Sequence, residues 1–274
     1  MTPWRILCAV TMLTLATGTG CGGARVEPID ITLAGTVTDA DELYSSILRA
    51  HVHEGVVDYE ALGKDERLNR YIAWLATTTP ESLADERSRL AYWINAYNAY
   101  TLKVVVDNFP INSIHNLHSG GKIIGFATKR TVWDKKFAEV GGTVYSLNHI
   151  EHQIIRKDFD DPRIHFALVC AARSCPHLRP EAYAGAHLDE QLDDQGQQFF
   201  AQSDKNRFDP TKPVAYLSKI LKWYGKDFGK TDVEVLRAIA PYLEVGVRKR
   251  ILSSPADWKI EYTSYDWDLN GRSR

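Results

Sequence analysis

The sequence predicts an α+β fold, a single mainly helical domain with a small, mostly antiparallel sheet. Most of the 274-residue chain carries apolar residues at helical spacing, and the runs typical of strands are few and short. No linker or internal repeat divides residues 39–270, which favours one domain. The 44% hydrophobic and 25% charged residues match an average globular protein, and the net charge of −2 argues against a nucleic-acid partner.

The N-terminus predicts an export signal. Arg5 precedes an apolar run over residues 6–16, which is too short to span a bilayer, and small residues follow it. Cys21 then occupies the place of the lipid-modified cysteine in lipoprotein signals. We therefore expect residues 1–20 to be a signal peptide and residues 21–38 to be a tether, which lipid on Cys21 anchors to a membrane on the periplasmic side.

The cysteine count supports this anchor. Cys8 lies within the signal and leaves with it. If Cys21 carries lipid, the even pair Cys170 and Cys175 remains, whereas a free Cys21 would leave one cysteine unpaired in an oxidising compartment. Gly22 rather than Asp follows Cys21, which resembles outer-membrane sorting and favours the outer over the inner membrane. A soluble secreted protein is the alternative.

The first half of the domain is predicted to be helical. A first helix begins near Asp39, with Asp39 or Asp41 as its cap, and a second covers residues 64–76. A third begins near Pro80, a residue suited to a first helical turn, and extends to about Val106. This third helix holds the densest aromatic patch of the chain, which we interpret first as core.

The second half is predicted to mix strands and helices. Extended runs over residues 133–140 and 143–146 flank Gly141-Gly142 and indicate a hairpin. A helix over residues 147–156 follows, and residues 164–169 have the composition of a short strand. The remaining expected elements are a helix over 188–201, an extended run over 214–217, short helices around Trp223 and Val235, and a strand over 258–265.

Three groups of side chains could carry chemistry, and the first lies on the helix over residues 147–156. His149, His152 and Arg156 share one face at helical spacing. Glu151 projects about 100° away from His152, so the two cannot both face a cleft fully. Paired histidines could bind a metal or supply a base with its orienting partner, but a solvated polar face explains the same pattern.

The second group surrounds two cysteines after the expected strand. Cys170 stands at the strand end, where it could act as a nucleophile, and Arg173 in the next loop could stabilise its thiolate. His152 is one of several histidines that could be its base. A Cys170–Cys175 disulfide, a reactive thiol and a metal site built from His and Cys are three open alternatives. We expect no cofactor other than such a metal.

The third group is a pair of side-chain amides, Asn95 and Asn98, inside the aromatic helix. Buried amides are costly unless they are hydrogen-bonded. They could bind the backbone of a neighbouring loop, or they could line a pocket and orient a ligand or a catalytic histidine.

Five motifs in order carry a resemblance to a known family. They are Trp93–Asn98, Ile150-Glu151-His152 with Arg156, His165–Pro176, Leu217–Ile220 with Trp223-Tyr224, and Tyr265–Trp267 with Leu269-Asn270. Over roughly residues 39–270 the chain resembles the uncharacterised family called domain of unknown function 547. The resemblance implies one domain and no known reaction, and it favours Cys170 over Cys175 as a nucleophile. The positions that it implies belong to the family pattern are Asn95, Asn98, Glu151, His152, Arg156, Cys170 and Tyr183.

Two hypotheses of function follow. In the first, a cleft around Cys170 and His152 catalyses thiol-dependent hydrolysis or acyl transfer, with Glu151 or Asn98 orienting the imidazole. Its small-molecule or peptide substrate would be held by Arg156, Asn95, Arg173 and Tyr183. In the second, the protein is a non-catalytic binding or structural module of the envelope, with a Cys170–Cys175 disulfide and a buried polar network.

Overall fold

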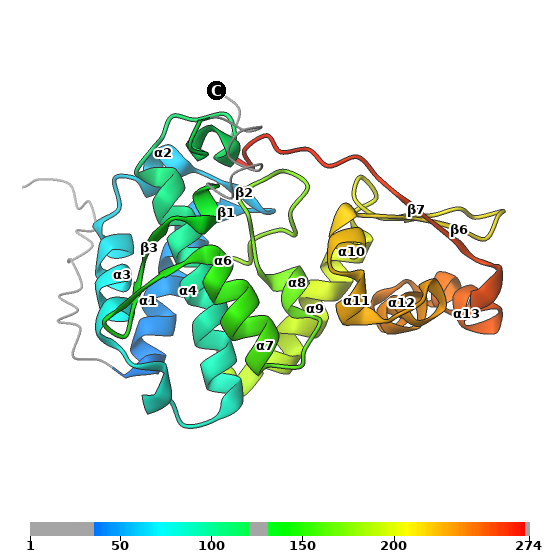
Figure 1. Ribbon diagram of the computed structural model, residues 1–274, viewed down its shortest axis with the longest axis horizontal. Helices are drawn as coiled ribbons and strands as arrows, with labels where there is room; N and C mark the ends of the chain where they lie inside the picture. Colours follow the sequence, from blue (N-terminus) through cyan, green and yellow to red (C-terminus); the bar gives the residue numbers. More distant parts are fainter. Residues whose placement is uncertain (1–35, 121–130, 272–274) are drawn as a thin grey trace, which may run out of the picture. The chain divides into compact units, whose positions relative to one another are not determined.

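The computed structural model describes residues 36–120 and 131–271 (Figure 1). The expected signal peptide and the lipid-bearing Cys21 lie outside the described residues. Within the described ranges, no helix combines the length and the apolar character of a membrane span. The fold is α+β, as predicted, with helices as its main component.

Helix α1 (Val37–His51) begins two residues earlier than predicted because Thr36, rather than an aspartate, is its N-cap. The Thr36 hydroxyl accepts a hydrogen bond from the Asp39 backbone at 3.3 Å, and the Asp39 carboxylate accepts one from the Thr36 backbone at 2.8 Å. This reciprocal capping box places Asp39 inside the first turn. Helix α3 (Glu66–Thr77) follows the short α2 (Tyr59–Leu62) and packs on α1.

Helix α4 (Glu86–Val106) is the centre of the first half of the fold. It begins at Glu86 rather than at Pro80, which forms a separate 3-10 turn, because the Asp85 carboxylate accepts the Ser88 backbone N–H at 2.7 Å and caps the helix there. Every residue from Leu90 to Leu102 is buried. A helix that is buried all round must be covered on every side, and α2, α3 and α9 (Leu188–Ala201) all contact α4.

The predicted hairpin is confirmed. Strand β3 (Lys136–Val140) pairs antiparallel with β4 (Thr143–Ser146), and Gly141 and Gly142 make the turn with positive φ angles of 57° and 77°. The single sheet of the prediction is replaced, among the described residues, by three small ones. The other two are the pair β1 (Val52–His53) and β2 (Val56–Val57), and the sheet of β5 (Arg207–Phe208), β6 (Val214–Leu217) and β7 (Lys259–Tyr262).

Strands β6 and β7 are parallel and run side by side in Figure 1, while the other strand pairs are antiparallel. Their sheet covers a core that includes Phe166, Phe199 and Leu236. The helices between β6 and β7 are α10 (Lys219–Trp223), α11 (Gly225–Phe228), α12 (Asp232–Ile239) and α13 (Val245–Ser253).

The predicted strand over residues 164–169 is wrong. Residues Ile164–Ala167 form one helical turn, α8, and the chain then runs extended to Cys170 without joining a sheet. The reason is a side chain of α4: Asn98 donates to the Ala167 carbonyl at 3.0 Å and accepts from the Val169 N–H at 2.9 Å. These bonds replace those that a neighbouring strand would have supplied.

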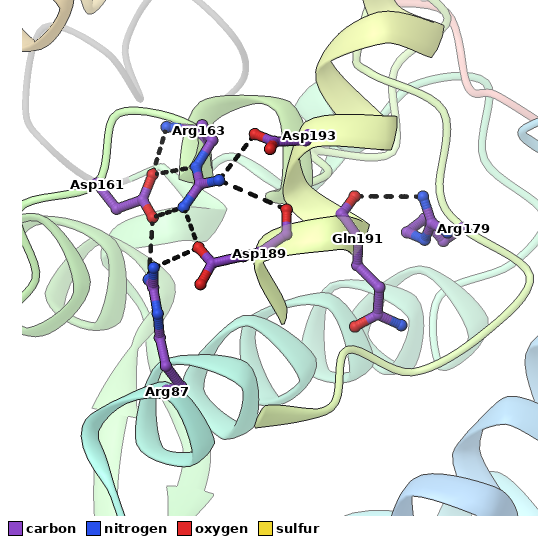
Figure 2. Close-up of polar contacts among 7 residues, drawn as sticks. All are labelled: Arg87, Asp161, Arg163, Arg179, Asp189, Gln191 and Asp193. Atoms are coloured by element: carbon purple, nitrogen blue, oxygen red, sulfur yellow. Dashed lines mark hydrogen bonds and ion pairs between the residues drawn. The ribbon is translucent and has the colours of Figure 1, made fainter. Parts of the chain in front are cut away.

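A cluster of ion pairs joins the start of α4, the segment before α8 and the start of α9 (Figure 2). Arg163 binds Asp161 at 2.7 Å and Asp193 at 2.8 Å, and Arg87 binds Asp161 at 3.2 Å and also Asp189. Arg163 also binds Asp189, at 2.5 Å, so Asp161 and Asp189 each bridge the two guanidinium groups and the cluster holds three segments in one arrangement. We interpret it as a structural tie.

Candidate functional site

An aromatic pocket of about 380 Å³ contains the residues with the most chemical interest. Apart from aromatic rings, it is lined by Glu151, His165, Asn148, Leu168, Ile220 and both domain cysteines, Cys170 and Cys175. Six rings line it and define what we call the aromatic pocket: Tyr97, Trp133, Trp223, Tyr224, Tyr265 and Trp267. A larger hollow of about 510 Å³ beside Pro110 holds only Arg173 among the predicted site residues, so we place the candidate site in the aromatic pocket.

The floor of this pocket comes from a helix with a widened middle. The predicted helix is present as α6 (Leu147–His149), a π-helical segment (Ile150–Ile155) and α7 (Arg156–Asp158) in succession. The backbone N–H of Arg156 therefore bonds the carbonyl of Glu151, five residues back. Such widened turns are frequent at functional sites.

Glu151 and His152 have different surroundings, in keeping with their expected divergence. Glu151 is only 7% exposed and lines the aromatic pocket. The side chain of His152 is 34% exposed and does not line the pocket, and its Nδ1 lies 3.9 Å from the nearer Glu151 oxygen. Of the two residues, the pocket uses only the glutamate.

Two tyrosines of the pocket lie close to the Glu151 carboxylate. Burial, the charge of Glu151 and the hydrogen bond to it raise the pKa of Tyr97 and of Tyr224 well above the usual value for tyrosine. Burial and the same carboxylate also raise the pKa of Tyr265. All three phenols therefore keep their protons at neutral pH and are uncharged beside the carboxylate.

Behind the pocket, a polar network is centred on Asp227 of α11. Its Oδ2 lies 2.7 Å from His165 Nε2, and both of its oxygens accept from Arg156 at 2.7 Å. The hydrogen bonds of His165 and Arg156 hold the pKa of Asp227 well below its usual range. Arg156, which the sequence places at the substrate, is paired with Asp227 behind the pocket.

Arg156 also forms a hydrogen bond with the ring of His152. Arg156 Nη1 lies 2.9 Å from His152 Nδ1, and because a guanidinium can only donate, this ring nitrogen is the acceptor. His165 stacks on Tyr224 with ring centres 4.1 Å apart and lines the pocket. His165 is therefore the histidine that reaches the pocket.

Of the three alternatives for the cysteines, the structure contains the disulfide. Cys170 and Cys175 are bonded, and the Tyr265 hydroxyl lies 3.2 Å from each sulfur. The Cys170 N–H points to the Cys175 sulfur at 3.0 Å, and Ala171 in the loop has a φ of +60°. In this form Cys170 is not a thiolate, so nucleophilic chemistry would require its reduction.

The remaining predicted site residues lie outside the pocket. Asn95 donates to the Tyr183 carbonyl at 2.7 Å and accepts from its N–H at 2.9 Å, while Asn98 binds the segment before Cys170. Both amides thus tie down backbone, which was one of their two predicted roles. Tyr183 is buried, and Arg173 faces Asp266 and Asp268 at the surface.

Within the described ranges there is no group of three or more His, Cys, Asp or Glu side chains placed to hold a metal ion. The pocket residues that the sequence did not single out as site residues include the rings of Trp133, Trp223, Tyr265 and Trp267. The signal for three of these rings was present, since Trp223, Tyr265 and Trp267 belong to the motifs that carry the family resemblance.

A known protein family matches part of the chain. Residues 80–200 match the family model described as "Protein of unknown function, DUF547". The predicted resemblance is confirmed over this range, which contains Tyr97, Glu151 and both bonded cysteines. No match was found among curated proteins or among solved structures.

Proposed function

We propose that this domain is a non-catalytic binding module that captures a small ligand in the aromatic pocket. The observation that carries the proposal is the lining itself: six aromatic rings surround about 380 Å³, with one buried carboxylate among them. Small-molecule sites are typically concave, mostly apolar and a few hundred Å³ in volume, and they hold a few converging polar groups.

The exposure of Trp223 supports a ligand. This side chain is 46% exposed although it lines the pocket, whereas Trp133 beside it is buried. A large exposed aromatic ring at the rim of a concave site loses area to water when a ligand covers it, which favours binding.

The pocket is held rigid before any ligand arrives. The Tyr265 and Trp267 ring centres are 4.5 Å apart, and Trp223 lies 4.8 Å from Tyr265. The disulfide fixes the loop beneath Tyr265. Rings that are already packed lose little conformational freedom on binding, so more of the contact energy becomes affinity.

Thiol-dependent catalysis has less support. Its nucleophile is bonded to Cys175, and the Nδ1 of His152 accepts from Arg156 instead of receiving a substrate proton. The alternative hypothesis of a binding module accounts for the same residues without reduction of the disulfide.

The proposed location is the cell envelope, with lipid on Cys21 as the anchor. The signal-like start of the chain and the Cys170–Cys175 disulfide support it, because disulfides persist mainly in oxidising compartments.

A thermal-shift screen of the unreduced full chain against small metabolites, sugars and peptides tests the binding proposal. Trp223→Ala should abolish the shift given by any hit, whereas Tyr262→Ala, which removes an exposed ring outside the pocket, should keep it. Hits that survive Trp223→Ala, or turnover of a hit by the unreduced protein, would contradict the proposal.

A further inference from the structure

We infer that the aromatic pocket takes an organic cation, a ligand with a quaternary or tertiary ammonium group. The inference rests on the proposed function and names its ligand class. Its two components are a set of aromatic rings at varied angles and a buried carboxylate that no lysine or arginine of residues 36–120 and 131–271 contacts directly.

The rings can surround a positively charged group. Trp267 lies at the centre of the set, with ring centres 4.5 Å from Tyr265, 5.8 Å from Trp223 and 5.9 Å from Trp133. The planes of these pairs are inclined by 51°, 29° and 59°, so the rings present π surfaces in several directions. A methylated ammonium group binds to such surfaces because each ring face is electron-rich.

Glu151 supplies the negative charge. Its carboxylate is buried in the pocket wall, and the neighbouring Tyr97 and Tyr224 are neutral phenols. The guanidinium of Arg156 is hydrogen-bonded to both oxygens of Asp227, whereas its charge acts on Glu151 only through space. A cationic ligand would provide Glu151 with the opposite charge in a site of low dielectric, where the attraction is strong.

The charge of the lining agrees with a cation. Among the described residues that line the pocket there is no lysine or arginine. An anionic ligand would therefore meet Glu151 without a compensating group, at an electrostatic cost.

Two polar side chains of the described lining are already engaged, which disfavours a sugar, the other ligand that aromatic rings commonly bind. The Asn148 amide donates to Asp134 at 2.6 Å, and the His165 ring is bound to Asp227. A sugar has a hydroxyl on most carbons and needs several partners, whereas an alkylated ammonium has no donor to satisfy when it is quaternary.

Isothermal titration of the unreduced full chain with choline and with dimethylbutanol, its uncharged carbon isostere, tests the inference. We expect choline to bind at least tenfold more tightly than dimethylbutanol. Glu151→Gln should remove that difference while leaving dimethylbutanol binding unchanged, and Trp223→Ala should weaken both. Tyr262→Ala, which alters an exposed ring outside the pocket, should change neither.

The outcomes separate the inference from the proposed function. The inference of a cationic ligand would be overturned by equal affinities for choline and dimethylbutanol, or by binding of N-acetylglucosamine that Trp223→Ala abolishes. Either result would leave the proposed binding module in place. If choline, dimethylbutanol, N-acetylglucosamine and the wider screen all fail to bind the wild-type chain, both are overturned. The comparison of the two isosteres needs no variant, so it decides the matter even if Glu151→Gln does not fold.

Discussion

Arg156 and Asp227 form an ion pair with two hydrogen bonds, both with N–O distances of 2.7 Å, and this pair joins α7, which continues the π-helical segment, to α11. A pair with two parallel hydrogen bonds fixes both direction and distance. Since Asp227 also binds His165, this contact sets the position of the pocket's histidine and of the helix that carries Glu151.

The first prediction concerns acid stability. The pKa of Asp227 is lower in the folded chain than in the unfolded one, so its ion pairs stabilise the fold fully above the unfolded value of about 4 and are lost as the pH falls through the folded value. Asp227→Asn should therefore lower the free energy of unfolding at neutral pH and weaken its dependence on pH below about 4.

Urea unfolding at a series of pH values measures this effect. Asp158→Asn, at an exposed carboxylate on α7, is the matched control and should keep the wild-type pH dependence. If the free energy of unfolding of Asp227→Asn fell with decreasing pH as steeply as that of wild type, the ion pair would contribute nothing to stability.

The local sequence pattern predicted an element correctly where the contacts that define the element lie within it or with its neighbour in the chain. The glycine pair between two extended runs predicted β3 and β4, and apolar spacing predicted α9 with its bounds. It failed for residues 164–169, because the groups that satisfy this backbone belong to Asn98, about seventy residues earlier.

The candidate site was predicted in part for the same reason. Glu151, Cys170 and Cys175 were selected from nearby motifs, and they do meet in one pocket. Asp227 could not be selected, since it lies on a four-residue helix without periodicity and its role depends on Arg156 and His165 from distant elements.

The second prediction concerns Asn98. Asn98→Ala would leave the Ala167 carbonyl and the Val169 N–H buried without partners, so we expect a loss of about 2–4 kcal/mol in the free energy of unfolding. Chemical denaturation measures it, with Asn69→Ala at an exposed position of α3 as the control, expected within about 0.5 kcal/mol of wild type. Equal stability of the two variants would contradict the role given to Asn98.

The third prediction concerns the cysteines. In the unreduced native protein, alkylation followed by intact mass should label neither Cys170 nor Cys175, and both should label after reduction and unfolding. Replacing both with serine should cost about 2 kcal/mol, the value expected for closing so short a loop. Rapid labelling of Cys170 in the native chain would instead favour the thiol-dependent hypothesis.

The fourth prediction concerns Trp223. Because its side chain is 46% exposed but packs on Tyr265 and Trp267, Trp223→Ala should lower the free energy of unfolding by about 1–2 kcal/mol, less than the roughly 3–5 kcal/mol of a core tryptophan. The same variant should lose ligand binding at the pocket. A large loss of stability measured by urea unfolding would mean that this ring belongs to the core.

The most direct measurement of the central claim follows the tryptophan emission of the unreduced full chain during titration with choline. Trp133, Trp223 and Trp267 line the pocket, so a bound cation should change their emission. We predict a saturating change that needs at least tenfold more dimethylbutanol than choline and that Trp223→Ala weakens for both. An emission that stays constant with choline, or that responds equally to its uncharged isostere, would contradict the cation-binding pocket.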